Sequence, residues 1–211
     1  MGRKTKEEAQ ETRNAILDAA EIVFKEHGVS RTSLAEVAAA AGVTRGAVYW
    51  HFKNKADLFD AMIQRVFDPF EAKLAELQAN DDANPIDMLR KLTRHFFDRI
   101  VNDPRYSRVI EIVWHKCEYV GEMARIRDTH AECGNRYVAV NEGAFRLAKE
   151  RGYLPATLDP RLAAIGMMAL ADGLIVNWTL DPQLFPLASD GPAILDLYLD
   201  GLQRKPLAGA G

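Results

Sequence analysis

The sequence is poor in cysteine and has no long apolar run. Its 211 residues include only Cys117 and Cys133, too few and too isolated for a disulfide framework or for a zinc site built on cysteine pairs. Both are expected to be reduced thiols, with redox sensing as the alternative. No stretch reaches the roughly eighteen uninterrupted apolar residues of a membrane span, and the polar N-terminus lacks the apolar core of a secretion signal. A cytoplasmic protein with no membrane partner is therefore expected.

Residue patterns that mark enzymes are also missing. No histidine has a glutamate three residues before it, as di-iron helical enzymes require, and no His-Glu-x-x-His, Gly-x4-Gly-Lys or Gly-x-Ser-x-Gly motif occurs. Glu111, His115 and Cys117 could recruit a metal, but so sparse a set is a weak signal. The sequence predicts no enzyme, no cofactor and no metal site.

An excess of positive charge, common in proteins that bind nucleic acids, is absent from the chain as a whole. The formal net charge is −3, but residues 1–55 carry a balance of +2 and the remainder −5. The cationic residues of the first part flank or open its expected helices, where phosphates could be met. A charge distribution without function remains the alternative, because the imbalance is mild.

What the chain does have is helical spacing of its apolar residues. Hydrophobic residues make up 48 % of it, enough for a buried core at this length. The segments 108–114 and 174–180 favour strands by propensity alone, but the helical period continues through their neighbours. We predict an all-α fold of about nine helices. Their expected ranges are 5–27, 33–41, 45–51, 54–69, 86–101, 104–116, 121–151, 159–180 and 192–204.

The first helices carry clear start and stop signals. Thr5 with Glu8 and Ser33 with Glu36 have the spacing of capping boxes, and Gly28 and Gly42 suit helix ends. Two short helices then follow each other across a glycine turn, with alanines at their contact. This is the layout of a helix-turn-helix, whose second helix enters the major groove of DNA.

Residues 32–55 closely resemble the DNA-binding domain of TetR-family repressors. The resemblance rests on Thr32, Ser33 and Leu34 and on residues 41–55, which read Ala-Gly-Val-Thr-Arg-Gly-Ala-Val-Tyr-Trp-His-Phe-Lys-Asn-Lys. Residues 3–13 and residues 112–118, Ile-Val-Trp-His-Lys-Cys-Glu, are similar to the AcrR and TtgR branch, which represses multidrug-efflux pumps. The likeness covers most of the chain. It implies an N-terminal three-helix DNA-binding domain, placed at 1–55, and a C-terminal ligand-binding and dimerisation domain, placed at 56–211.

The candidate DNA contacts lie on and around the second short helix. Thr44 and Arg45 are the expected base-edge readers, because the arginine fork can pair with guanine. Gly46 allows close approach, and the aromatic residues suit sugar and phosphate contacts. Phe52 is expected in the core, and a surface cluster for protein contact is the alternative reading. The full candidate set is Thr32, Ser33, Thr44, Arg45, Gly46, Tyr49, Trp50, His51 and Lys55.

A single short reader helix contacts few base pairs, so we expect a homodimer on operator half-sites about 34 to 36 Å apart. The resemblance implies that the last two helices build the dimer interface, and packing within one chain is the alternative. The candidate interface residues are Ala163, Gly166, Ala169, Gly173, Leu195, Tyr198, Leu199 and Leu202.

The resemblance also implies an apolar cavity for hydrophobic drugs between the middle helices. Asp172 is the candidate ligand anchor, with a structural hydrogen bond as the alternative, and the bulk of Trp114 and Tyr137 bears on pocket size. Pro69 is expected to kink or break its helix and to pass the ligand signal to the reader, or else to be a static bend. The candidate pocket residues are Val66, Leu92, Phe96, Ile110, Val113, Trp114, Tyr137, Asn141, Met168, Asp172, Ile175 and Val176.

Together these features predict a transcriptional repressor of a multidrug-efflux operon that binds double-stranded operator DNA and is released by a hydrophobic small molecule. The alternatives are a regulator of a metabolic operon that senses a small aromatic or fatty acid, and an activator.

Overall fold

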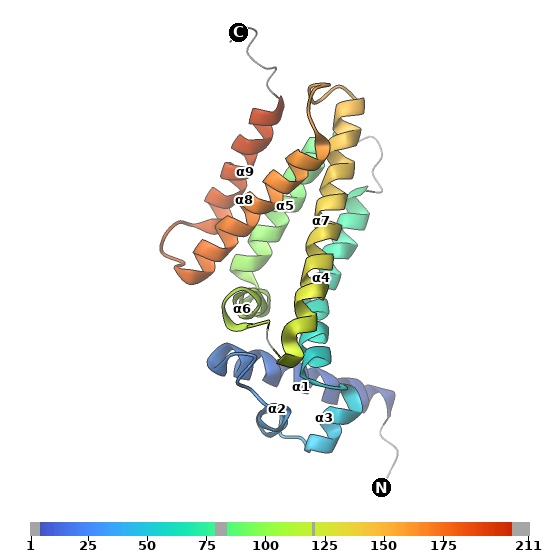
Figure 1. The fold of residues 1–211 in the computed structure, drawn as a ribbon, viewed down its shortest axis with the longest axis vertical. Coiled ribbons are helices and arrows are strands. Elements are labelled where there is room, and N and C mark those ends of the chain that lie inside the picture. Colours follow the sequence, from blue (N-terminus) through green and yellow to red (C-terminus); the bar gives the residue numbers. More distant parts are fainter. Residues whose placement is uncertain (1–4, 79–83, 120, 204–211) are drawn as a thin grey trace. The chain divides into compact units, whose positions relative to one another are not determined.

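The computed structural model describes residues 5–78, 84–119 and 121–203, with only the backbone described at 68–78, 122 and 125. All regular elements in this part of the chain are helical, which confirms the all-α prediction (Figure 1). The α-helices are α1 (Lys6–His27), α2 (Leu34–Ala40), α3 (Arg45–His51), α4 (Lys55–Gln78), α5 (Pro85–Asn102), α6 (Pro104–Glu111), α7 (Ala124–Glu150), α8 (Pro160–Leu180) and α9 (Leu187–Gln203). A π-helical turn η1 (Ile112–Lys116) continues α6, and a 3-10 turn η2 (Gly121–Met123) precedes α7.

Side-chain caps fix the starts of the first helices, as the spacing predicts. The Thr5 hydroxyl accepts a hydrogen bond from the Glu8 N–H at 3.2 Å, and the Glu8 carboxylate accepts one from the Thr5 N–H at 2.9 Å. Ser33 and Glu36 form the same reciprocal pair at the start of α2. Gly28 and Gly42 follow these helices with φ of 82° and 65°, where a side chain would be strained.

Two prolines lie inside helices. α4 continues through Pro69 to Gln78, so a break at that residue is excluded. α9 begins at Leu187 and contains Pro192, so the expected start at residue 192 is wrong. A proline removes one backbone donor, but the remaining hydrogen bonds and the packing of the helix can outweigh that loss.

The chain forms two compact units. Unit 1 comprises residues 1–69 and 104–130, and unit 2 comprises residues 70–103 and 131–211. In unit 1, α1 packs on α2, α3, α6 and η1, around a core that includes Phe24, Phe59 and Tyr106. In unit 2, α9 packs on both α5 and α8, around Phe97 and Leu199. The predicted boundary between 1–55 and 56–211 stays a prediction, because these units are defined by contacts and not by independent folding.

Candidate functional site

Helices α2 and α3 form the expected helix-turn-helix. Val37 and Ala38 of α2 and Val48 of α3 are buried, and the Val43 N–H donates to the Ala38 carbonyl at 3.0 Å across the turn. Phe52, which follows α3, is 2 % exposed and belongs to the core as predicted. The buried face of α3 is thus fixed on unit 1, and its opposite face is open.

The open face of α3 carries a cation and aromatic rings. Tyr49 and Trp50 are 46 % and 73 % exposed, and Arg45 and Gly46 are exposed too. Arg45 donates to the Tyr49 hydroxyl at 3.3 Å and lies over its ring, 5.4 Å from the centroid. The half-buried His51 ring meets Trp50 edge-on at 4.5 Å. This arrangement suits phosphate, sugar and base-edge contacts, because it joins hydrogen-bond donors to flat apolar surfaces.

Thr44 is the N-cap residue of α3, the helix expected to read the DNA bases. Its hydroxyl accepts a hydrogen bond from the Ala47 N–H at 3.2 Å, so it caps α3. Ser33, likewise exposed, caps α2. The Thr44 hydroxyl can still donate its proton while it accepts from the backbone, so capping and DNA contact are compatible roles for it. The Ser33 hydroxyl already donates to the Glu36 carboxylate at 2.7 Å.

Lys55 and Thr32 are placed differently from the rest of the candidate set. Lys55 is only 7 % exposed, and its ammonium donates to the Ser30 carbonyl at 3.0 Å and to the Thr32 carbonyl at 2.9 Å. Thr32 is 2 % exposed, and its hydroxyl donates to the Gly28 carbonyl at 2.8 Å. These side chains hold the turn between α1 and α2 from within.

Unit 2 contains a narrow cavity of about 10 Å³, on the order of one water molecule. Three predicted pocket residues line it, namely Leu92, Phe96 and Tyr137, and so does Leu195 from the predicted interface set. The other lining residues are Thr93, Phe97, Met167 and Ala171. These four were missed because a helical period marks an apolar face but does not say which part of it borders a void.

Polar groups lie on the same helices as this cavity lining. Asn141 is 1 % exposed and donates to the Tyr137 carbonyl at 2.8 Å, while its Oδ1 has no hydrogen-bond partner in the part of the chain described. Burial raises the pKa of the half-buried Asp172 carboxyl to about 6. Burial also raises the pKa of Tyr137 to about 12, and the nearby Asp172 carboxylate adds to that rise.

The remaining pocket candidates divide between the units. Val66, Ile110 and Val113 are buried in unit 1, where the half-buried Trp114 meets His130 at 5.6 Å between ring centroids. Ile175 is buried in unit 2, and Met168 and Val176 are half-buried there. The common pocket implied for all twelve residues therefore stays a prediction.

Several candidate interface residues are already covered by their own chain. Ala163, Leu195 and Leu199 are at most 3 % exposed. The Tyr198 hydroxyl donates to the Ala163 carbonyl at 2.8 Å and covers Gly166, where an added Cβ would lie 2.5 Å from the hydroxyl oxygen. Ala169 is exposed, and Gly173 and Leu202 are half-buried. This side of α8 packs on α9 within one chain.

The outer side of α8 and α9 is apolar and open. Leu162 and Leu197 are 67 % and 72 % exposed, and Ile165 is 38 % exposed. By length and composition alone α8 could cross a membrane, although only 28 % of its most apolar window is buried within the protein. Such a helix needs a cover for its exposed apolar side chains.

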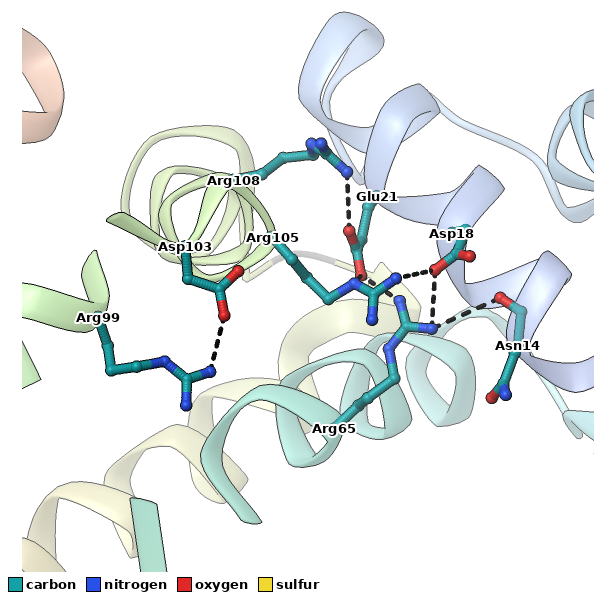
Figure 2. A network of polar contacts seen from close by, with 8 residues as sticks. All are labelled: Asn14, Asp18, Glu21, Arg65, Arg99, Asp103, Arg105 and Arg108. Atoms are coloured by element: carbon teal, nitrogen blue, oxygen red, sulfur yellow. Dashed lines mark hydrogen bonds and ion pairs between the residues drawn. The ribbon is translucent and has the colours of Figure 1, made fainter. Parts of the chain in front are cut away.

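Unit 1 also contains a buried acidic residue that the sequence analysis did not single out. Glu21 is 0 % exposed and pairs with Arg65 and Arg108 (Figure 2). Its position, four residues after the buried Leu17 and three before the buried Phe24, was the available signal, because that spacing sets it on the inner face of α1. No group of three or more metal-binding side chains occurs within the described ranges.

Sequence profiles identify the family. The profile of the bacterial regulatory proteins of the tetR family matches residues 16–62, and that of the C-terminal region of MAATS-type transcriptional repressors matches residues 84–204. The chain therefore belongs to the TetR family of transcriptional regulators, and it is a regulator and not an enzyme.

The chain is also similar to individual regulators and to solved structures of repressors. The chain is 40 % identical to the transcriptional regulator TtgR of Pseudomonas putida over 98 % of both chains, and 44 % identical to AcrR of Shigella flexneri over 94 % of both. Among solved structures, it is similar to NalD, the secondary repressor of the MexAB-OprM multidrug efflux pump in Pseudomonas aeruginosa. The TM-score is 0.85 at 35 % identity, over 95 % of this chain and 100 % of NalD. A complex of SmeT with triclosan matches with a TM-score of 0.83 at 33 % identity, over 95 % of this chain and 100 % of that one.

Proposed function

We propose that this protein is a ligand-responsive repressor that binds the operator of a multidrug-efflux operon and leaves it when a hydrophobic drug binds. The observation that carries the proposal is the open face of α3, where Arg45, Tyr49 and Trp50 stand on a helix-turn-helix. Support for the operon comes from the similar proteins NalD and SmeT, which are repressors of multidrug efflux pumps. The site of action is the cytoplasm, where operator DNA lies.

Two copies of the chain are proposed to bind together through the open side of α8 and α9. A second copy seated on Leu162, Ile165 and Leu197 covers the exposed apolar surface of both molecules at once. The dimer presents two α3 helices to half-sites about 34 to 36 Å apart. Of the predicted interface residues, Ala169, Gly173 and Leu202 keep surface for such a contact.

The effector is proposed to enter unit 2 at the cavity between α5, α7, α8 and α9. Its apolar lining suits a hydrophobic ligand, and Tyr137 supplies a hydroxyl to orient it. A volume of about 10 Å³ is far below the roughly 300 Å³ of a drug pocket, so the ligand must select a more open arrangement. Asp172 remains a proposed anchor, on the helix that contributes Met167 and Ala171 to the lining.

Footprinting of the DNA upstream of the gene tests the DNA-binding half of the proposal. We expect protection of paired half-sites, and an affinity that falls steeply with salt, by about 0.9 in log–log slope for each phosphate contact. Tyr49→Ala should abolish the footprint and leave thermal unfolding almost unchanged, since this side chain is exposed and does not belong to the buried core. A complex insensitive to salt would contradict the assignment.

A panel of hydrophobic drugs, with triclosan among them, tests the effector half on the same DNA. Release by at least one member is expected. Indifference to all of them would overturn the efflux reading and leave operator binding intact. Release by a small aromatic or fatty acid in their place would assign the protein to a metabolic operon.

A further inference from the structure

Two exposed side chains of α3 contact each other on its open face. Arg45 and Tyr49 are four residues apart, so they lie on the same side of the helix. The Arg45 Nη2 donates a hydrogen bond to the Tyr49 hydroxyl oxygen at 3.3 Å, and the Arg45 Cζ lies over the ring, 5.4 Å from its centroid. The hydrogen bond is long, but the ring distance suits a cation–π contact, so the two interactions together hold the guanidinium group against Tyr49.

Tyr49 is the less mobile partner of this pair. A tyrosine side chain has few rotatable bonds and loses little entropy when it is held, whereas an arginine side chain is long and flexible. Helix α3 is itself fixed, because Val48 is 0 % exposed and the Thr44 hydroxyl caps the helix start. The Tyr49 ring is therefore a fixed surface that restricts the directions in which the Arg45 guanidinium group can point.

The contact with Tyr49 leaves the guanidinium group able to bind a base. The group carries several N–H donors, and the hydrogen bond to the hydroxyl uses one of them. A bidentate contact with guanine O6 and N7 can use others. Because both contacts can exist together, the freedom that Arg45 has lost to Tyr49 is not lost again when guanine binds, and this favours recognition of that base.

The Tyr49 hydroxyl can serve Arg45 and a phosphate together. It accepts a hydrogen bond from Arg45 and keeps its own proton, which a phosphate oxygen can accept. The two roles have different consequences. A phosphate contact strengthens binding to every DNA sequence, whereas a contact that positions Arg45 acts only at the base pair that Arg45 reads.

We propose that Tyr49 positions the Arg45 guanidinium group and thereby sets how strongly the protein distinguishes guanine from other bases at the position that Arg45 reads. The proposal deepens the proposed function and rests on it, because it assumes that α3 binds operator DNA. Tyr49 is in this role a positioning residue that acts on specificity through Arg45, in addition to any phosphate contact that it makes.

Operator variants measure this effect in the full-length protein. Each G·C pair of a footprinted half-site is replaced in turn, and the discrimination is the ratio of the Kd for the changed fragment to the Kd for the original one. The pair at which Arg45→Ala loses discrimination is the pair that Arg45 reads. A phosphate contact of Tyr49 does not affect this ratio, because a loss that is equal on all fragments cancels in it.

Tyr49→Phe keeps the ring and removes the hydroxyl. At the pair read by Arg45 it should lower the discrimination by about threefold, because the hydrogen bond that orients the guanidinium group is lost. In the Arg45→Ala background, Tyr49→Phe should have no further effect on discrimination at any pair, since the group that it positions is gone.

Tyr153→Phe is the matched control. It removes the same hydroxyl group from a tyrosine of nearly equal exposure, 43 % against 46 % for Tyr49, in the segment between α7 and α8. It should change neither the operator affinity nor the discrimination at any pair.

The operator variants also give the results that would overturn the proposal. An equal loss on every fragment, with a salt slope reduced by about 0.9, would make Tyr49 a phosphate contact only. A loss at the Arg45 pair that persists in the Arg45→Ala background would mean that Tyr49 reads the base itself. If Arg45→Ala loses discrimination at no pair, Arg45 reads no base and the effect of Tyr49 on specificity is excluded.

NMR relaxation of the Arg45 Nε–H group, measured without DNA, tests the positioning independently of the operator. The group should be ordered in the wild type, more mobile in Tyr49→Phe and most mobile in Tyr49→Leu, which also lacks the ring. Equal mobility in all three proteins would overturn the positioning. If the wild type binds no upstream DNA, the proposed function fails and the effect on specificity fails with it, whereas the relaxation still decides whether Tyr49 holds Arg45.

Discussion

Lys55 has a buried ammonium group, which is unusual in proteins. Its hydrogen-bond partners explain the burial. The carbonyls of Ser30 and Thr32, in the turn that leads into α2, accept hydrogen bonds from its ammonium group. A cation that completes the hydrogen bonding of a turn stabilises the entry into α2, and in that role it need not touch a phosphate.

Lys55→Met keeps the apolar stem and removes the donor, so it separates these two roles. We expect the free energy of unfolding to fall by about 2 kcal/mol, because the buried Thr32 carbonyl and the partly buried Ser30 carbonyl lose a hydrogen-bond donor. The salt slope of operator binding should stay unchanged. Urea unfolding and salt titrations measure the two quantities, with the exposed Lys53→Met as a control for stability. A slope reduced by about 0.9 would instead identify Lys55 as a phosphate contact.

The carboxyl of Asp172 makes stability depend on pH. Its pKa rises from 3.8 in the unfolded chain to about 6 in the folded protein because of burial. A raised acid pKa means that the folded state binds the proton more tightly, so its contribution to stability is complete below pH 4 and is lost as the pH rises through 6.

The stability of Asp172→Asn should therefore increase relative to that of the wild type as the pH rises. Near pH 4 the protonation of Asp172 should contribute little to the difference in free energy of unfolding between the two proteins. Above pH 7 this contribution should favour the variant by about 1 to 2 kcal/mol, a value reduced for the partial exposure of the carboxyl. Urea unfolding of both proteins from pH 4 to pH 8 measures this difference. A difference that does not vary with pH would show that the carboxyl keeps its ordinary pKa.

At the scale of the elements, helix starts were predictable and some helix contacts were not. A capping side chain bonds to a backbone N–H within three residues, so the local sequence predicts the helix starts at Thr5, Ser33 and Asp159. The start of α9 was predicted wrongly at Pro192 because proline is common in the first turn of a helix but also occurs further inside one.

The candidate site shows the same division between local and distant information. The open face of α3 follows from the period of its buried residues, so its exposed members were predicted. The buried roles of Lys55 and Glu21 depend on partners in other elements, such as Ser30 and Arg108, which no local pattern reveals. Contacts between distant segments are fixed by packing, and one sequence does not specify them.

The contact between α8 and α9 depends on a glycine. Tyr198 crosses Gly166 so closely that a methyl group there would lie 2.5 Å from its hydroxyl oxygen. Gly166→Ala should lower the free energy of unfolding by about 1 to 2 kcal/mol through overpacking. Tyr198→Phe removes the clashing oxygen, so in its background the alanine should cost less. Urea unfolding of the wild type, the two single variants and the double variant gives the coupling free energy between residues 166 and 198. Purely additive effects would show that the Tyr198 ring moves aside without cost.

At the scale of the whole molecule, the two units need a partner copy to give operator specificity. One α3 helix reads few base pairs, and the affinity of a dimer for paired half-sites exceeds that of either half because the second contact is intramolecular. An apolar α8 that is mostly uncovered within one chain fits this requirement. Operator binding through α3 should therefore depend on the interface that we propose on α8 and α9.

A charge on the open side of α8 and α9 should separate the copies. Leu162 and Leu197 are 67 % and 72 % exposed on that side, so Leu197→Glu buries an unpaired carboxylate in each half of a dimer and leaves the core of one chain unchanged. Sedimentation should show a shift from dimer to monomer, and operator affinity should fall by at least about a hundredfold. Ile22→Glu, at an exposed residue of α1, is the matched control for oligomeric state. A dimer that survives both Leu162→Glu and Leu197→Glu would place the interface on another face.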